Sequence, residues 1–184
     1  MWMKGWKNYF ISVCVAIFRL KAEKLVYSIK KGYVILMKIA IACDHRGYEA
    51  KELIKSLLQR GGHEILDFGA NESKSCDYPD YAIPASKAVA AGQADRGVLI
   101  CGSGIGMSIT ANKVRGIRAA LCHDELTAQM SRKHNDANVL CLPAMLINDP
   151  LITRIVETWL ATEFEGGRHE RRVQKMMEAE RDCK

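Results

Sequence analysis

The sequence predicts an α/β fold in which a doubly wound, mostly parallel five-stranded sheet of Rossmann type carries helices on both faces. Short apolar runs rich in β-branched residues alternate with segments of helical periodicity from Lys38 to the end of the chain. One such run, residues 97–100, leads directly into a glycine-rich turn, Cys101–Gly106, and then into a helix. A length of 184 residues without an internal repeat suits a single domain, which we place at residues 37–184.

Each expected strand is a short apolar run bounded by polar residues or glycine. The expected strands cover residues 38–43, 64–68, 96–100, 116–121 and 139–142. The first expected helix has Leu53, Ile54 and Leu57 at helical spacing, and the fifth has Leu151, Ile155 and Trp159 on one apolar side. The expected helices cover residues 48–60, 79–91, 107–113, 125–133, 150–162 and 168–181. Glycine pairs at Gly61 and Gly166 end the first and the fifth helix. We expect the charged last helix to serve in dimerisation.

Residues 1–36 differ in composition from the rest of the chain. They hold seven Lys and Arg residues and one acidic residue, whereas residues 37–184 hold twenty of each kind. The net charge of +6 therefore belongs to this leader and does not indicate a nucleic-acid-binding domain. Its apolar run, Phe10–Phe18, is too short for a bilayer, which needs about 20 residues. We expect an N-terminal extension upstream of a native start at Met37; a basic amphipathic surface helix is the alternative. No stable membrane insertion is expected.

Several cofactor classes lack their sequence signals. The seven cysteines are scattered without a CxxC pair, which disfavours a disulfide framework or a zinc site and fits a reducing cytoplasm. The histidines are not paired at metal-ligand spacing. The glycines of the central turn are spaced as Gly102-x-Gly104-x-Gly106, unlike the dinucleotide fingerprint, and no P-loop lysine is present. We therefore expect no metal and no cofactor.

Ligands of doubly wound sheets bind outside the carboxyl ends of the strands. Polar residues follow three expected strands there: Asp44-His45, Cys101–Gly106 and His123-Asp124. The glycine turn brings backbone N–H groups close to a ligand, and partial positive charge beside Cys101 favours its thiolate. The alternative for this turn is a buried structural cysteine. The alternative for Asp44 is a helix N-cap.

Two further candidates lie away from these strand ends. His134 and Asn135 precede the fifth strand, at its amino end, so they should not reach Cys101 of the same chain. They form a structural turn unless a second subunit brings them across an interface. Arg168 and Arg172 share one face of the last helix and can bind a phosphate together. A solvated charged face is the alternative, although cations at a helix N-terminus oppose the helix dipole.

Six segments, taken together and in order, resemble the type B ribose-5-phosphate isomerases from residue 37 to about 181. The segments are Cys43-Asp44-His45, Asp77–Tyr81, Cys101–Gly106, Asn112-Lys113 with Gly116–Ala119, His134–Asn138 and Gly166–His169. These enzymes belong to a sugar-phosphate isomerase family that includes galactose-6-phosphate isomerase subunits. The resemblance implies interconversion of ribose 5-phosphate and ribulose 5-phosphate, without metal or cofactor. It also implies homodimers or dimers of dimers with shared active sites.

The resemblance also implies roles for individual residues. Cys101 is similar to the base that moves a proton between C1 and C2, and His134 to the acid that opens the sugar ring. The implied substrate contacts, with the turn amides around the enediolate oxygen, are Asp44, His45, Tyr78, Gly102, Ser103, Gly104, Ile105, Gly106, Asn135, Arg168 and Arg172.

One position departs from the family pattern. The family usually has a phosphate-binding arginine eleven residues after the histidine, where this chain has Met145. Losing such a contact costs about 1.5–3 kcal/mol of binding. Either another cation, for which Arg46 is a candidate, compensates, or the preferred substrate differs. The alternatives are therefore a hexose-6-phosphate isomerase of the same family, a non-catalytic sugar-phosphate binding module, and a thiol-redox protein using Cys101.

Overall fold

The computed structural model describes residues 36–182 of the chain. From Met37 onward, these residues belong to one compact unit. Our interpretation of the leader as an N-terminal extension concerns residues outside the described part, except Leu36, and stays a prediction.

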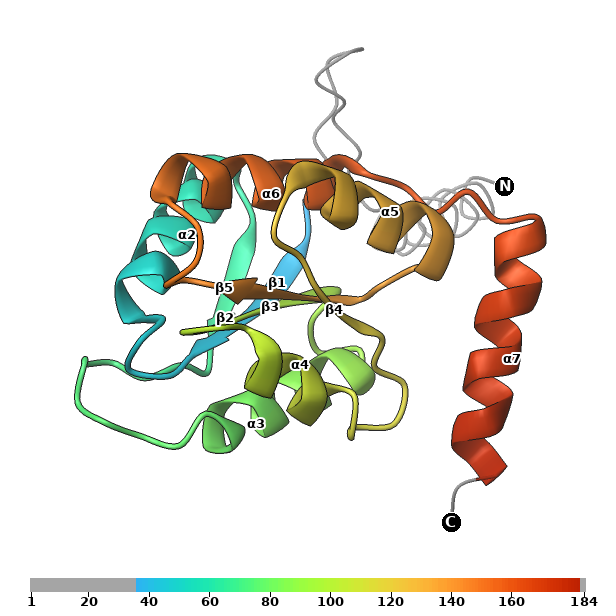
Figure 1. Cartoon of the computed structure of the whole chain (residues 1–184), viewed down its shortest axis with the longest axis horizontal. Helices are drawn as coiled ribbons and strands as arrows, with labels where there is room; N and C mark the ends of the chain where they lie inside the picture. Colours follow the sequence, from blue (N-terminus) through green and yellow to red (C-terminus); the bar gives the residue numbers. More distant parts are fainter. Residues whose placement is uncertain (1–35, 183–184) are drawn as a thin grey trace, which may run out of the picture. The chain divides into compact units, whose positions relative to one another are not determined.

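Five parallel strands form a single sheet in the order β2-β1-β3-β5-β4. The strands are β1 (Lys38–Cys43), β2 (Glu64–Asp67), β3 (Arg96–Cys101), β4 (Ala119–Leu121) and β5 (Val139–Pro143). The chain places β2 on one side of β1 and then crosses to the other side, where β3 pairs with β1, β4 forms the far edge and β5 enters last between β3 and β4. The doubly wound arrangement predicted from the alternating pattern is thereby confirmed (Figure 1).

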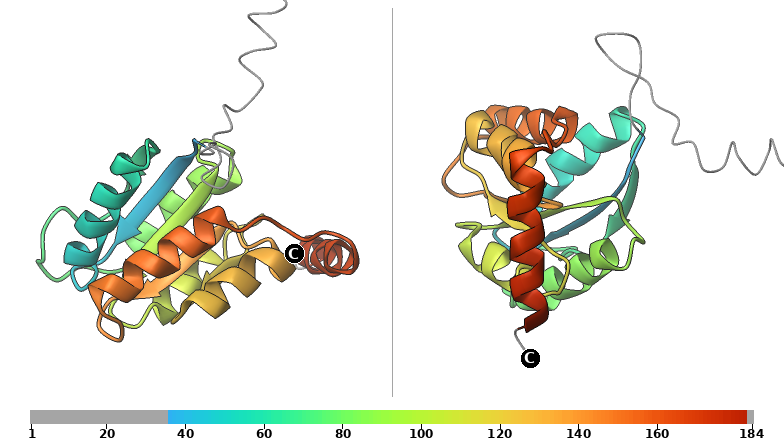
Figure 2. Two further views of the ribbon diagram at one scale, coloured as in Figure 1. Left: turned by 90° about the horizontal axis from the view of Figure 1, so that it is seen from above. Right: turned by 90° about the vertical axis from the view of Figure 1, so that its right-hand side faces the viewer.

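Helices cover both faces of this sheet. They are α2 (Tyr48–Arg60), α3 (Pro79–Ala90), α4 (Ile105–Ala111), α5 (Glu125–Asn135), α6 (Asp149–Ala161) and α7 (Arg168–Asp182). One face carries α2, α5 and α6, and the other carries α3 and α4 (Figures 1 and 2). The last helix, α7, stands outside these layers beside the end of α5 (Figures 1 and 2).

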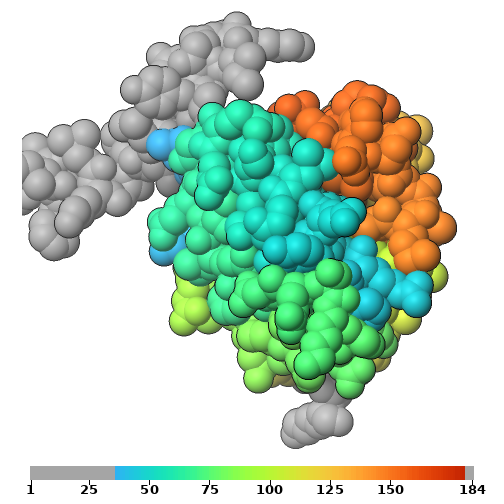
Figure 3. Space-filling model, turned by 90° about the vertical axis from the view of Figure 1, so that its left-hand side faces the viewer, coloured from blue at the N-terminus to red at the C-terminus, as the bar shows by residue number. Residues whose placement is uncertain are grey.

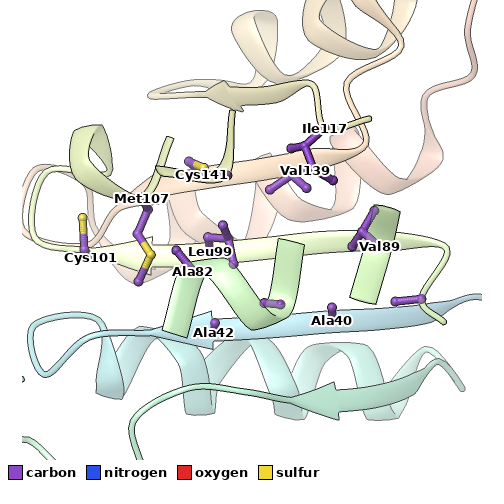
Figure 4. Packing of buried hydrophobic residues seen from close by; sticks show 13 residues of the cluster. Ala40, Ala42, Ala82, Val89, Leu99, Cys101, Met107, Ile117, Val139 and Cys141 are labelled. Atoms are coloured by element: carbon purple, nitrogen blue, oxygen red, sulfur yellow. The ribbon is translucent and has the colours of Figure 1, made fainter. Parts of the chain in front are cut away.

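The central strands are buried on both faces, as a parallel sheet between helices requires. On the α3 and α4 face, small residues such as Ala40, Ala42 and Ala82 let the helices approach the sheet closely. Figure 4 shows Cys101 at the end of β3 within this cluster. Rigid packing beneath the turn fixes the position of the Cys101 thiol at the rim of the sheet.

Most boundaries lie within one or two residues of those predicted, and two element starts are shifted for a reason visible in the backbone. Helix α4 begins at Ile105 rather than at Met107, because Gly104 adopts φ 71° and turns the chain directly into the helix. Strand β4 begins at Ala119 rather than at Gly116. Its start is delayed because Gly116 adopts φ 86°, so the chain is still turning at that residue.

Candidate active site

The segments that follow β1, β3 and β5 meet at the carboxyl end of the sheet. The Asp44 N–H donates to the Ile100 carbonyl at 3.2 Å, and the Met145 N–H donates to the Gly102 carbonyl at 3.0 Å. We call the group at this end the cysteine site; its members are Asp44, His45, Arg46, Tyr78, Cys101–Gly106 and Met145. Figure 3 faces this end and shows the β1–α2 segment between the loop before α3 and the start of α6.

Cys101 is held by the turn that follows it. Its side chain lies at the end of β3 with 5% of the residue exposed. The Gly104 N–H donates to Cys101 Sγ at 3.1 Å. Within the described part of the chain, the N–H groups of Ser103 and Gly106 have no hydrogen-bond acceptor, whereas the Ile105 N–H donates to Ser103 Oγ. The turn therefore combines a positioned thiol with backbone donors able to receive a developing negative charge.

The glycines of the turn allow side chains to lie directly against its backbone. A Cβ atom on Gly106 would come within 2.7 Å of the Tyr78 ring, so Tyr78 packs over the turn. A Cβ atom on Gly102 would come within 2.9 Å of Met145 Sδ and 3.0 Å of Arg46 Cδ. These contacts place Tyr78 beside the Cys101 turn, and its role as a substrate contact stays an expectation from the family resemblance.

Asp44 shapes the loop after β1 and does not cap α2. Its Oδ1 accepts hydrogen bonds from the N–H groups of Arg46, at 2.9 Å, and Gly47, at 3.1 Å. The N-cap of α2 is Gly47, so the N-cap alternative for Asp44 is wrong. His45 is half-buried, and its Nδ1 accepts the N–H of Cys76 at 3.3 Å. Asp44 and His45 thus lie beside the Cys101 turn, as their strand-end position predicts.

Two other buried thiols, those of Cys43 and Cys122, differ from Cys101 in their hydrogen bonds. Cys43 Sγ donates to the Ala70 carbonyl, and Cys122 Sγ donates to the Ala120 carbonyl. Burial raises the pKa of Cys43 to about 12 and that of Cys122 to about 11, so both stay protonated at neutral pH. Cys101 Sγ instead accepts an N–H group. Among these three thiols, Cys101 has the environment suited to proton transfer.

A second group lies at the amino end of the sheet, where α5 ends and α7 begins. We call it the histidine site; its members are His134, Asn135, Glu165, Arg168, His169 and Arg172. The rings of His134 and His169 are stacked, with centroids 4.1 Å apart and an interplanar angle of 4°. Glu165 Oε2 lies 3.8 Å from His134 Nε2 and 3.7 Å from His169 Nε2. The histidine site is thus assembled from two segments that are separate in sequence, the end of α5 and residues 165–172.

Charge around the histidine site favours an anionic ligand. Burial, followed by the positive charges of His134, Arg168 and Arg172, lowers the pKa of His169. The Arg168 Nε–H donates to His169 Nε2 at 3.2 Å, so the lone pair of that nitrogen is engaged. His134, Glu165 and His169 offer metal-ligand atoms within 4.8 Å of one another, a grouping that sequence spacing did not reveal. The adjacent guanidinium groups make this grouping better suited to phosphate than to a metal dication.

The topology separates the two sites within one chain. Cys101 ends β3, whereas His134 lies in the last turn of α5, just before the amino end of β5. The structure therefore brings the loop that carries Asp44 and His45 beside the Cys101 turn but keeps His134 at the other end of the sheet. His123 and Asp124, the third strand-end candidate, begin a helix: the Asp124 carboxylate accepts the Thr127 N–H in a capping box at the start of α5.

Five residues near the two sites are not assigned to a site by the sequence alone. They are Arg46, Cys76, Met145, Glu165 and His169. The sequence offers Arg46 only as a candidate cation, because nothing in the residues around it predicts a position over Gly102. Glu165 lies in the segment that joins α6 to α7, and His169 lies in the first turn of α7. The Glu165 N–H donates to the Lys133 carbonyl and so holds that segment against α5.

None of the described helices is both long enough and apolar enough to span a membrane.

A doubly wound sheet with a glycine-rich turn at its carboxyl end is typical of α/β proteins that bind small molecules at that end. Residues 39–176 match the family model described as Ribose/Galactose Isomerase, and the chain belongs to this family. The resemblance found in the sequence motifs is therefore confirmed.

Individual relatives agree with this assignment. The chain is 49% identical to a putative sugar phosphate isomerase of Bacillus subtilis, over 78% of this chain and 97% of the relative. It is 46% identical to ribose-5-phosphate isomerase B of Escherichia coli, over 76% and 93% of the two chains. Ribose-5-phosphate isomerase B of Clostridium thermocellum has a similar structure, with a TM-score of 0.79, 49% identity, and coverage of 80% and 100%. A Mycoplasma genitalium homologue with bound ribulose-5-phosphate gives a TM-score of 0.77 at 40% identity, covering 79% and 97%.

Proposed function

We propose that the chain is an aldose–ketose isomerase that interconverts ribose 5-phosphate and ribulose 5-phosphate in the pentose phosphate pathway of the cytoplasm. The names of its relatives support this substrate pair. The observation that carries the chemical assignment is the hydrogen bond from the Gly104 N–H to Cys101 Sγ, in a turn with further backbone donors beside it.

Cys101 is the base of the proposed reaction. As the thiolate, it takes the proton from C2 of the open-chain aldose, and the electron pair of the C–H bond forms the C1=C2 double bond of an enediolate. The turn amides from Gly102 to Gly106 stabilise the negative charge on the enediolate oxygen. Return of the proton to C1, with transfer of the O2 proton to O1, gives the ketose. Asp44, His45 and Tyr78 position the sugar beside the thiol.

The histidine site supplies the other half of the proposed active site. His134 acts as the acid that opens the furanose ring, with Asn135 beside it, and Arg168 and Arg172 bind the phosphate. Because His134 lies at the opposite end of the sheet from Cys101, the two halves meet only between subunits. The active enzyme is therefore a homodimer or a dimer of dimers with shared sites.

Exposed apolar side chains on α4 and the position of α7 support this assembly. Ile105 and Ile109, one helical turn apart on α4, are 52% and 58% exposed beside the cysteine site. Apolar side chains on one helix face are suited to burial against another subunit. Helix α7 stands outside the layers of its own domain (Figure 2), and we assign it to the dimer interface.

The test is an isomerase assay on purified Cys101→Ala, with Cys122→Ala as the matched control. Cys122 is a buried thiol at the end of β4 that lies outside the proposed chemistry. We expect Cys101→Ala to lose about 10³-fold or more in kcat and to stop exchange of the C2 hydrogen with deuterated water. The control should keep near wild-type turnover. Near wild-type turnover in Cys101→Ala would reject the mechanism.

A hexose-6-phosphate isomerase is the second candidate function, and Met145 favours it because the family's usual phosphate-binding arginine is absent there. Relative kcat/KM on ribose 5-phosphate, allose 6-phosphate and galactose 6-phosphate discriminates the two functions. Ligand binding without any C2 hydrogen exchange would instead identify a non-catalytic sugar-phosphate binding module.

A further inference from the structure

Arg46 extends over the mouth of the cysteine site. Its Nη1 donates to Met145 Sδ at 3.2 Å, and its Cδ lies 3.0 Å from the point where Gly102 would carry a Cβ atom. Both side chains are exposed, Met145 by 61%. The guanidinium therefore lies at the entrance to the Cys101 turn, on the same subunit as the thiol.

The loop after β1 sets the direction of the Arg46 side chain. The Asp44 carboxylate accepts the Arg46 N–H at 2.9 Å and fixes the backbone of the residue. Gly47, the next residue, packs against β3 so closely that a Cβ atom would lie 2.7 Å from the Ile100 carbonyl oxygen. With the backbone held on both sides, the Arg46 side chain leaves the loop toward Gly102 rather than toward bulk solvent.

The charge of Arg46 is not neutralised by the described part of the protein. No carboxylate oxygen of a described residue lies within the 4.0 Å ion-pair distance of its guanidinium. Its side-chain partner is a thioether, which is a weak acceptor. A guanidinium carries five N–H donors that match phosphate oxygens in pairs. Arg46 thus presents most of its donors, and its full charge, to a ligand at the entrance.

We propose that Arg46 binds the phosphate of the substrate from the subunit that provides Cys101, with Met145 holding the guanidinium in place by contact. This inference rests on the proposed function, because it identifies how the same site selects a phosphorylated sugar. Met145 Sδ touches Arg46 Nη1, so an arginine introduced at position 145 reaches the region that the Arg46 guanidinium occupies.

The experiment moves the guanidinium group from position 46 to position 145. The variants Arg46→Met, Met145→Arg and the double variant Arg46→Met/Met145→Arg are compared with the wild type. Arg60→Met is the matched control, because Arg60 is an exposed arginine at the end of α2 that bonds Ser56. For each protein, KM and kcat are measured with ribose 5-phosphate, and the Kd of inorganic phosphate is measured by calorimetry.

We expect Arg46→Met to raise KM about tenfold to a hundredfold, with kcat changed by less than about twofold. The Kd of inorganic phosphate should rise by a similar factor, and the double variant should regain most of both losses. A KM that stays unchanged, or a raised KM with an unchanged phosphate Kd, would overturn the proposal. If the wild type shows no isomerase activity, the proposed function fails, and the phosphate titrations alone then decide whether Arg46 is the phosphate ligand.

Discussion

Arg118 holds the turn that carries His134 by donating from Nη2 to Asp136 twice, to its backbone oxygen at 2.7 Å and to its Oδ2 at 2.8 Å. Arg132 Nη1 donates to the other carboxylate oxygen of Asp136, also at 2.7 Å. Among the described residues, Asp136 is the one non-glycine residue with positive φ, at 46°. Its carboxylate therefore bridges two arginines and keeps a left-handed turn closed beside the histidine site.

Asp136→Ala should lower the free energy of unfolding by about 2–3 kcal/mol, because two guanidinium groups lose their acceptor and alanine resists the left-handed conformation. Asp136→Asn should lose about half of that, since asparagine tolerates this conformation and keeps one carbonyl acceptor. Urea denaturation of both variants measures the difference. Equal losses in the two variants would show that the conformation of the turn does not matter.

Gly104 and Gly92 form a matched pair for testing the packing of the Cys101 turn. Both adopt φ 71°, but a Cβ atom on Gly104 would clash with Leu121 Cδ1 and lie 3.0 Å from the Leu142 carbonyl carbon, whereas nothing lies within 4 Å of one on Gly92. Gly92→Ala should cost about 1–2 kcal/mol of stability from backbone strain alone. Gly104→Ala should cost about 2–4 kcal/mol, because overpacking adds to the strain. Similar midpoints of urea denaturation in the two variants would contradict this account.

Stability at acid pH should depend on Asp67. Lys51, whose side chain is 1% exposed, donates from Nζ to both oxygens of this carboxylate, at 3.2 and 3.1 Å. Burial by itself raises the pKa of Asp67, but hydrogen bonds from Lys55 and Gly69 and from Lys51 outweigh it, so the pKa lies below its usual 3.8. The stabilisation by ionised Asp67 is therefore complete above the unfolded pKa and disappears as the pH falls through the folded pKa.

Asp67→Asn should destabilise the protein by about 2–4 kcal/mol at neutral pH, because the buried Lys51 ammonium loses its less exposed carboxylate partner and keeps only Glu52, at 3.3 Å. The stability gap between the wild type and this variant should stay constant above about pH 5 and narrow below about pH 4. Urea denaturation at a series of pH values measures the gap. A gap of the same size at pH 3 and pH 7 would show that ionisation of Asp67 contributes nothing.

The alternation of apolar runs and helical segments was sufficient to predict the fold, because parallel strands joined by helices have few allowed arrangements. It was not sufficient for boundaries set by single residues. Gly104 starts α4 early, and Gly116 delays β4, each through a positive φ that the apolar pattern does not encode.

The candidate site was predictable where its residues directly follow strands, as Asp44 and Cys101 do. Contacts between distant segments were not. Arg46 and Met145 are 99 positions apart and meet only because β1 and β5 both flank β3. His134 and His169 stack only because the segment before α7 is bonded to the end of α5. The spacing of residues along the sequence does not predict such contacts.

Subunit complementation tests most directly the claim that each chain holds half of two active sites. Cys101→Ala and His134→Asn are prepared separately, each expected to be nearly inactive, and then unfolded and refolded together in equal amounts. Random pairing makes half of the dimers mixed, and each mixed dimer has one site with both native residues, so isomerase activity should return to about a quarter of that of the wild type. If the mixture stays as inactive as its components, while calorimetry or native mass spectrometry confirms mixed dimers, Cys101 and His134 do not share a site between subunits.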